Sequence, residues 1–183
     1  CYDSISIPCD KVVALCGDSG CGKTTMIRSL TRYYPYTSGR ISLYGHDLVE
    51  YSQKELTDKL FYVPQKTFFF AGSIRDNLVY GIDREVTDEE MMAALEKACL
   101  SDALIKKVST QSQSANDGIL SYMIGEGGTG LSGGECQRLS IARAFLRRPE
   151  VYIFDESTAN LDKATADTVL TNIEKYANKI GAG

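Results

Sequence analysis

A glycine-rich segment near the start of the chain has the residue types and spacing of a phosphate-binding loop. It fits the pattern GxxxxGK[ST] with Gly17, Asp18, Ser19, Gly20, Cys21, Gly22, Lys23 and Thr24, and Thr25 follows it. Glycines let backbone N–H groups approach phosphate oxygens, because no Cβ stands in the way. Lys23 can bring its ammonium to the β- and γ-phosphates, and the Thr24 hydroxyl can bind Mg²⁺. The loop predicts nucleotide phosphate binding, but it does not identify the reaction.

Two carboxylates follow an apolar run late in the chain. The run 151–154 is followed directly by Asp155 and Glu156. Ligands of open parallel sheets bind at the carboxyl ends of the strands. Asp155 at such an end can hold Mg²⁺ opposite Thr24, and Glu156 can act as a general base toward a water molecule. An acidic strand end is common by itself, so this interpretation depends on the phosphate loop in the same chain.

A second candidate anion site lies at residues 132–135. Ser132 and Glu135 have the spacing of a capping box, with Gly133 and Gly134 in the first helical turn. Such a helix start presents backbone amides and a hydroxyl to an anion. The chain therefore carries two predicted phosphate sites.

The order of these motifs resembles that of the ABC (ATP-binding cassette) family over nearly the whole chain. LSGGECQR at 131–138 resembles the family signature, YVPQ at 62–65 its Q-loop, and STANLD at 157–162 its D-loop. Two further segments, 124–128 and 70–78, resemble the X-loop and the segment after the Q-loop of the exporter subgroup. The family more often has Gln where this chain has Glu135, and either residue can close a capping box.

This resemblance implies a role for each motif residue. ATP and Mg²⁺ would be bound by the phosphate loop, with Gln65 joining Thr24 and Asp155 at the metal. Glu156, Lys23 and Gln65 would be the catalytic residues, and Asp162 would link two sites. The signature would bind ATP held by another subunit, through Leu131, Ser132, Gly133, Gly134 and Glu135.

The resemblance also implies partners. It predicts a domain that dimerises, with an identical or a different copy, around two Mg-ATP molecules to power transmembrane export. Transmembrane domains of the same transporter would hold it at the cytoplasmic face of a membrane. The aromatic run 68–70 is interpreted either as a docking surface for them or as core packing. The transported substrate is not readable from these residues, and import is not excluded.

Two other function classes compete with this one. An ABC ATPase that acts on chromosomes, DNA repair or ribosomes would usually carry a long coiled-coil or nucleic-acid-binding insertion, and none is visible. A P-loop kinase would not need a second phosphate site. The net charge of −4 and the lack of a basic stripe further argue against nucleic acid as a partner.

The elements that would position these motifs indicate an α/β fold. We expect a P-loop NTPase core (1–66 and 131–183) with a mainly parallel sheet and an N-terminal antiparallel β portion, interrupted by a helical insert (67–130). Predicted strands cover 4–8, 12–16, 39–44, 61–63 and 151–154. Predicted helices cover 23–34, 53–60, 87–99 and 132–147, followed by a last helix with Val169, Ile173, Tyr176 and Ile180 on one face.

Composition sets the remaining limits. Six cysteines without a CxxC pair favour reduced thiols over disulfides or zinc. No apolar run approaches the ~20 residues that span a bilayer. His46 lies away from the position of the family's switch histidine, and Tyr2 is a poor match to its adenine-stacking aromatic residue. We therefore expect the chain to be a piece of a longer transporter.

Overall fold

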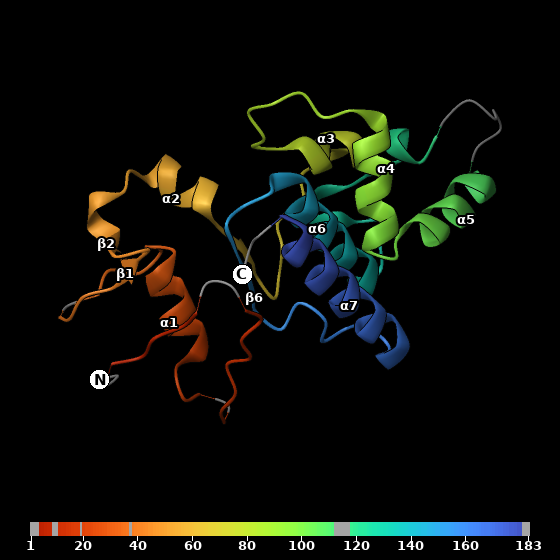
Figure 1. Cartoon of the computed structure of the whole chain (residues 1–183). Helices are drawn as coiled ribbons and strands as arrows, with labels where there is room; N and C mark the ends of the chain where they lie inside the picture. Colours follow the sequence, from red (N-terminus) through yellow and green to blue (C-terminus); the bar gives the residue numbers. More distant parts are fainter. Residues whose placement is uncertain (1–3, 9–10, 19, 37, 112–117, 181–183) are drawn as a thin grey trace.

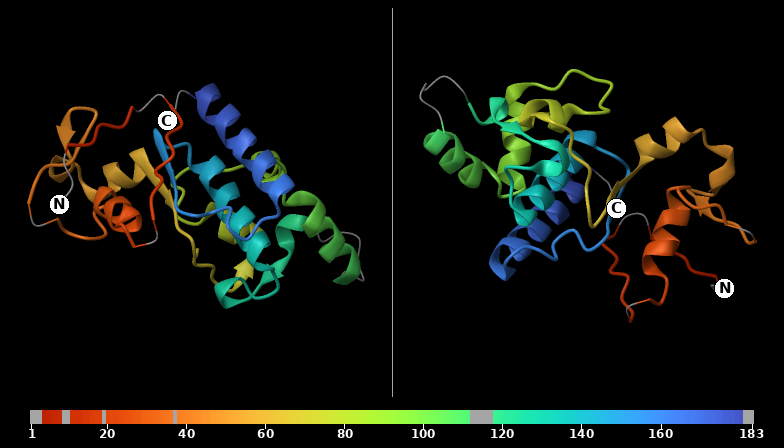
Figure 2. Two further views of the ribbon diagram at one scale, coloured as in Figure 1. Left: turned by 90° about the horizontal axis from the view of Figure 1, so that it is seen from below. Right: turned by 180° about the vertical axis from the view of Figure 1, so that it is seen from behind.

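The computed structural model describes residues 4–8, 11–18, 20–36, 38–111 and 118–180. Figures 1 and 2 show two groups of elements on either side of a short central sheet. One group holds helices α1 (Lys23–Leu30) and α2 (Gln53–Lys59) with strands β1 (Ser42–Leu43) and β2 (His46–Asp47). The other holds helices α3 to α7. The central sheet lies between them and carries the acidic strand end.

The central sheet is a parallel pair, β3 (Leu60–Val63) and β6 (Val151–Phe154), in the register Leu60 to Val151 and Val63 to Phe154. The pairing continues one residue further, because the Asp155 N–H donates to the Val63 carbonyl at 3.0 Å. Since both strands end at the same edge, the segments that begin at Pro64 and Asp155 leave the sheet side by side. The predicted Q-loop and the acidic pair are therefore neighbours.

The larger group packs around α6 (Gly133–Arg147). Its other elements are β4 (Gly72–Ser73), α3 (Ile74–Val79), α4 (Asp88–Lys97), α5 (Ser101–Gln111), β5 (Met123–Ile124) and α7 (Lys163–Ile180). One buried apolar cluster joins side chains from all of α3, α4, α6 and α7, including Leu78, Leu95, Ile141 and Val169. The predicted insert 67–130 thus shares its core with α6 and α7, and the division of the chain into core and insert stays a prediction.

Most predicted helices are present in the structure, with the capping boxes or the buried apolar faces that the sequence indicated. Capping boxes begin α2 at Ser52, α4 at Thr87 and α6 at Ser132. Val169 and Ile173 of α7 are buried, as their helical spacing predicted. The helix predicted over 23–34 ends earlier, at Leu30, because Arg32 takes a left-handed conformation with φ of 56°.

The strand predicted over 39–44 is shorter than expected. Only Ser42–Leu43 forms β1, which pairs antiparallel with β2 through a turn at Tyr44 and Gly45. Both turn residues have positive φ, 52° and 83°, as a two-residue type I′ hairpin requires. This hairpin is an antiparallel β portion in the N-terminal part of the chain, and β4 and β5 form a second antiparallel pair.

The strand predictions for 4–8 and 12–16 are wrong for this structure. The described residues of these segments form no strand, and Val12, Val13 and Leu15 are 64%, 49% and 42% exposed. An apolar run becomes a buried strand only when a neighbouring strand accepts its hydrogen bonds. Within the described part of the chain, β3 pairs with β6 alone. The α/β class is confirmed, but the parallel sheet has fewer strands than we expected.

Arg143 of α6 ties the segment after β3 to the centre of the larger group. Its guanidinium donates to the Asn77 carbonyl (2.6 Å), the Asn77 Oδ1 (2.9 Å) and the Phe68 carbonyl (2.8 Å). It also stacks 4.4 Å above the ring of Phe69, which is fully buried. Burial lowers the pKa of Arg143 to about 10, so the side chain stays charged at neutral pH.

Arg143→Ala should therefore lower the free energy of unfolding by about 2–4 kcal/mol, because three acceptors lose a charged donor and Phe69 loses its stacking partner. Urea denaturation measures this change. Arg40→Ala is the control, because Arg40 is exposed and forms only a surface pair with Asp47, so a change within about 0.5 kcal/mol is expected there. Equal effects of the two substitutions would contradict the anchoring role.

Candidate functional site

The predicted phosphate loop leads into α1, which begins at Lys23. Gly20 and Gly22 have φ of 82° and 99°, left-handed conformations that side chains disfavour. A Cβ on Gly17 would lie 2.9 Å from the Cys21 Sγ, so the loop closes tightly on itself. Asp18 and Thr25 flank these turns, and Ser19 lies outside the described residues. The loop therefore needs glycine where the pattern has it, at a helix start suited to an anion.

Lys23 points back over this loop. Its Nζ donates to the Gly17 carbonyl at 2.6 Å and to the Asp18 carbonyl at 2.9 Å. The ammonium is therefore held at the loop itself, and it would exchange these two carbonyls for any phosphate that it binds.

Asp155 connects three elements at the end of β6. Its Oδ1 accepts from the Thr24 hydroxyl of α1 at 3.4 Å, and its Oδ2 accepts from the Tyr62 hydroxyl of β3 at 2.9 Å. Asp155 is 9% exposed. Burial, and next the hydrogen bond to Asp155, raise the pKa of Tyr62, so the phenol keeps its proton and acts as a donor. The two residues that we predicted at a metal, Thr24 and Asp155, are thus in contact although they lie far apart in sequence.

Glu156 lies beside Asp155 with its carboxylate exposed. Its Oε2 accepts from the Gln65 amide at 2.8 Å, which brings two predicted catalytic residues together. The backbone of Glu156 is left-handed, with φ of 49°, a conformation that costs a residue with a side chain about 1 kcal/mol or more. Gln137 of α6 holds this backbone, because its amide donates to the Glu156 carbonyl at 3.5 Å. Strain of this kind clusters at functional sites.

A cavity of about 220 Å³ opens where these groups meet. It is lined by Thr24, Arg28, Tyr62, Pro64, Gln65, Lys66, Asp155 and Glu156. A hydroxyl, a carboxylate and an amide oxygen are the ligands that Mg²⁺ prefers, so Thr24, Asp155 and Gln65 fit such an ion. The exposed carboxylate of Glu156 can accept a proton from water. The cavity thus suits a water-consuming reaction beside a metal-bound phosphate.

Several residues of this site were not predicted. Tyr62, Arg28 and Gln137 contact or line it, yet none belongs to the part of a motif that carries chemistry. Tyr62 stands next to Val63 in the YVPQ segment, and strand alternation could have indicated that its side chain lies on the face opposite to that of Val63. Gln137 is a polar residue on the buried side of α6, and a polar residue at such a position indicates a site less clearly than strand alternation does.

The predicted signature residues lie at the start of α6 and do not line this cavity. The Ser132 Oγ accepts from the Glu135 N–H at 3.3 Å, and the Glu135 carboxylate accepts from the Ser132 N–H at 2.6 Å. Burial acts to raise the pKa of Glu135, but hydrogen bonds from Ser132 and Lys107 outweigh it and leave the pKa lowered. Leu131, Ser132 and Gly133 are accessible at the surface. The start of α6 is therefore closed by its capping box, has the charged Glu135 on its buried side, and exposes Ser132 and Gly133 at the surface.

The predicted D-loop packs against this helix start. A Cβ on Gly134 would lie 3.0 Å from the Asn160 carbonyl, so only glycine allows this approach. The Asn160 N–H donates to the Gln137 side chain at 3.0 Å, and Gln137 also reaches Glu156. Asp162 caps α7, because its carboxylate accepts from the Thr165 N–H at 3.0 Å, and this lowers the pKa of Asp162. The D-loop therefore connects the cavity to the start of α6.

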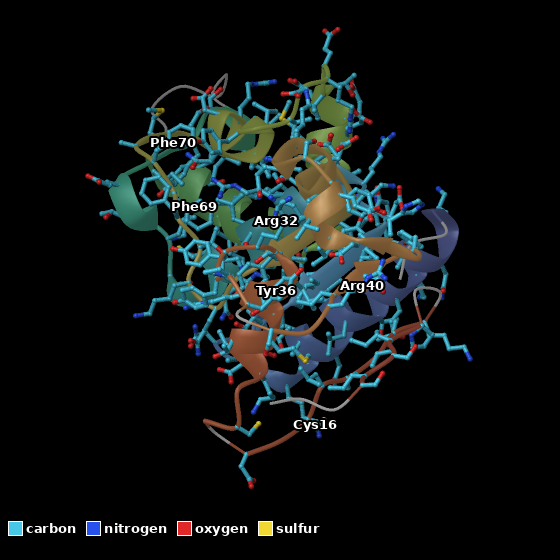
Figure 3. All side chains as sticks on the ribbon, turned by 90° about the vertical axis from the view of Figure 1, so that its left-hand side faces the viewer. Cys16, Arg32, Tyr36, Arg40, Phe69 and Phe70 are labelled. Atoms are coloured by element: carbon cyan, nitrogen blue, oxygen red, sulfur yellow. The ribbon has the colours of Figure 1, made fainter. Side chains whose placement is uncertain are left out.

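The two segments with exporter-like sequence lie side by side. β4 pairs with β5, and the Gly127 N–H donates to the Phe69 carbonyl at 2.8 Å. The aromatic run divides between surface and core: Phe68 is 66% exposed, Phe69 is fully buried, and the half-buried Phe70 packs on Tyr80. Figure 3 labels Phe69 and Phe70 of this run. Core packing is therefore confirmed for Phe69, whereas a docking role for the exposed Phe68 stays a prediction.

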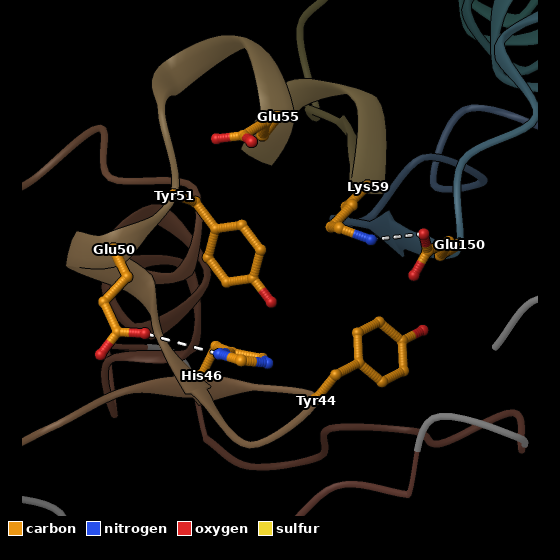
Figure 4. A pocket seen from close by; sticks show the side chains of 7 residues that line it. All are labelled: Tyr44, His46, Glu50, Tyr51, Glu55, Lys59 and Glu150. Atoms are coloured by element: carbon orange, nitrogen blue, oxygen red, sulfur yellow. Dashed lines mark hydrogen bonds and ion pairs between the residues drawn. The ribbon is translucent and has the colours of Figure 1, made fainter.

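A larger cavity, about 570 Å³, lies away from all of these residues. Figure 4 shows its lining: Tyr44, His46, Glu50, Tyr51, Glu55, Lys59 and Glu150. Its carboxylates already have partners, because Glu50 pairs with His46 at 3.5 Å, Glu150 with Lys59 at 2.6 Å, and Glu55 accepts from the Ser52 N–H. His46 is exposed. We place the chemistry in the smaller cavity, because the carboxyl ends of β3 and β6 and the predicted residues Thr24, Gln65, Asp155 and Glu156 converge there.

Comparisons with known proteins bear on the same residues. A family model described as ABC transporter matches residues 3–159. The chain is 41% identical over 171 residues to the iron-sulfur clusters transporter atm1, mitochondrial, of Aspergillus fumigatus, covering 93% of the chain and 22% of that protein. It is 42% identical over 159 residues to the ATP-dependent lipid A-core flippase of Photorhabdus laumondii, covering 87% and 26%.

A solved structure, that of a bacterial Atm1-family ABC exporter with ATP bound, superposes with a TM-score of 0.78 at 34% identity. The match covers 88% of the chain and 27% of the exporter. The chain therefore spans about a quarter of the proteins that it matches. In the part of the chain that the structure describes, every helix is too short or too polar to cross a membrane.

Proposed function

This chain belongs to the ABC transporter family as an ATP-binding domain of exporter type, and on that premise we propose that it hydrolyses ATP as one half of a dimer that closes around two Mg-ATP molecules and powers transmembrane export. The observation that carries the proposal is the convergence of Thr24, Gln65, Asp155 and Glu156 on one cavity, with the open start of α6 outside it. One chain thus offers a complete reaction site and a separate anion site.

In this proposal the residues of the chain divide the work at the cavity. The loop 17–25 binds the phosphates through its amides and Lys23, which leaves its two carbonyl partners for them. Thr24, Asp155 and Gln65 hold Mg²⁺, which when bound neutralises phosphate charge. Glu156 accepts a proton from the attacking water, and its bond from Gln65 orients the carboxylate that does so.

The start of α6 binds the γ-phosphate of ATP held by the partner subunit. Ser132 and Gly133 are exposed, so a second subunit can reach them without unfolding the helix. Asn160 lies between Gly134 and Gln137, and Gln137 holds the Glu156 backbone. Through these contacts a partner docked at the signature and the D-loop, including Asp162, would adjust the position of Glu156.

The remaining partners are the transmembrane domains of the same transporter. They would hold the domain at the cytoplasmic face of the membrane and contact the paired segments 70–78 and 124–128. Phe68 and Tyr80, which flank the first segment in sequence, are exposed. In this proposal residues 1–66 and 131–183 form the ATPase core, and 67–130 form the subdomain that transmits movement to the membrane part.

The solution mass of the Glu156→Gln variant, with and without Mg-ATP, tests the dimer. We expect a shift from monomer to dimer on adding Mg-ATP. Adding Ser132→Asp should weaken this dimer by at least roughly tenfold, because the new carboxylate faces phosphate charge. Aspartate is an N-cap as good as serine, so α6 should stay folded.

Ser52→Asp is the matched control, since Ser52 is an exposed N-cap of α2 in a capping box of the same kind. It should leave the mass shift unchanged. A dimer that tolerates Ser132→Asp would remove the signature from the interface. A chain that binds ATP but stays monomeric in every variant would contradict closure of two identical copies.

A further inference from the structure

Tyr62 occupies an unusual position beside the acidic strand end. It lies on β3 opposite Ile153 of β6, and its hydroxyl donates to Asp155 Oδ2 at 2.9 Å. The other oxygen of the same carboxylate, Oδ1, accepts from Thr24 at the longer distance of 3.4 Å. Tyr62 therefore makes the shorter of the two contacts that orient Asp155.

A second side chain engages the phenol. Arg28 lines the same cavity as Tyr62, close enough for its positive charge to act on the phenol, and its Nη1 donates to the Tyr34 hydroxyl at 2.9 Å. Arg28 belongs to α1, the helix that begins at Lys23. The phenol of Tyr62 thus binds the carboxylate at the end of β6 in a cavity that the helix behind the phosphate loop also lines.

When one oxygen of a carboxylate is held by a hydrogen bond, only the other oxygen is available to a ligand. Asp155 is 9% exposed, so loss of the Tyr62 hydroxyl would leave a buried carboxylate oxygen without this donor and free the group to rotate. Outer groups that orient a metal ligand typically change metal affinity by roughly 10- to 100-fold when removed.

We propose that Tyr62 is a positioning residue for the divalent cation: its phenol holds Asp155 Oδ2 so that Oδ1 and the Thr24 hydroxyl face the cavity together. This inference rests on the proposed function, because it assigns Asp155 to the metal that accompanies ATP. In this arrangement Tyr62 acts through Asp155.

The test compares nucleotide binding with and without a metal. The affinity of the chain for AMP-PNP, a non-hydrolysable ATP analogue, is measured by calorimetry in Mn²⁺ and again in EDTA. Tyr62→Phe should weaken Mn²⁺-dependent binding by roughly tenfold and leave metal-free binding unchanged. Phenylalanine keeps the ring and the strand pairing, so only the hydroxyl is lost.

Tyr152→Phe is the matched control. Tyr152 lies on β6 in the same pair of strands, and its buried hydroxyl has no hydrogen-bond partner among the described residues. Its removal should leave both affinities unchanged. Thermal unfolding of the two variants checks that each remains folded.

A double-mutant cycle with Asp155→Asn separates positioning from a general structural effect. If Tyr62 acts through Asp155, Tyr62→Phe should have no further effect on metal-dependent binding in the Asp155→Asn background. An equal loss with and without metal, or no loss at all, would overturn the role of Tyr62 and leave the proposed function standing. A wild-type chain whose binding of AMP-PNP does not respond to Mn²⁺ would overturn both.

Discussion

Glu156→Gln should lower the rate of ATP hydrolysis by roughly 10²- to 10⁴-fold, the usual contribution of a general base. The amide keeps the size of the carboxylate but cannot accept a proton from water. Its backbone conformation, with φ of 49°, is as accessible to Gln as to Glu, so the site should keep its shape. Phosphate release measures the rate, and calorimetry should show ATP affinity within about threefold of the wild type.

Glu150→Gln is the control for this substitution. Glu150 immediately precedes β6, whereas Glu156 follows it, and its carboxylate is exposed and paired with Lys59 at the surface. The same chemical change at the other end of the strand should leave hydrolysis unchanged. Turnover by Glu156→Gln within tenfold of the wild type would show that another group accepts the proton.

Lys23→Ala should weaken ATP binding by at least roughly 100-fold and reduce hydrolysis at low ATP by the same factor. A hydrogen bond from a charged group contributes about 1.5–3 kcal/mol, and an ammonium between two phosphates makes two of them. The two carbonyl contacts that Lys23 gives up, at 2.6 and 2.9 Å, offset part of this gain. Calorimetric titration with ATP measures the change.

Lys179→Ala provides the reference for loss of a positive charge, because Lys179 is an exposed residue of the last turn of α7. It should leave ATP affinity unchanged. The two variants of the site should also differ from each other, since Glu156→Gln keeps the nucleotide and Lys23→Ala loses it. Retention of ATP by Lys23→Ala would locate the phosphates elsewhere.

Local patterns determined the parts of this protein that depend on a few neighbouring residues. The phosphate loop could be predicted because its glycines, Lys23 and Thr24 act within one turn of backbone. The starts of α4 and α6 could be predicted because a capping box is a contact between residues three apart. Strand β6 and the acidic pair after it were visible as an apolar run with a polar end.

Strand predictions failed where the pairing partner decides the outcome. The run 12–16 is as apolar as 151–154, yet only the latter lies next to a strand that accepts its hydrogen bonds. The same reason explains the aromatic run 68–70, in which neighbouring phenylalanines have opposite environments. Composition describes what a segment can bury, but a strand or a buried ring also needs a particular neighbour.

Tertiary structure alone decided which side chains support the site. Tyr62, Arg28 and Gln137 were not predicted to act at the site, and they lie beside Asp155 and Glu156 only because α1, β3, β6 and α6 meet at one strand edge. The chemistry of the site restricts which residue types can perform it, so these residues can be predicted individually from the sequence. The side chains that hold them in place are constrained only by geometry, and that geometry exists once segments distant in sequence have packed together.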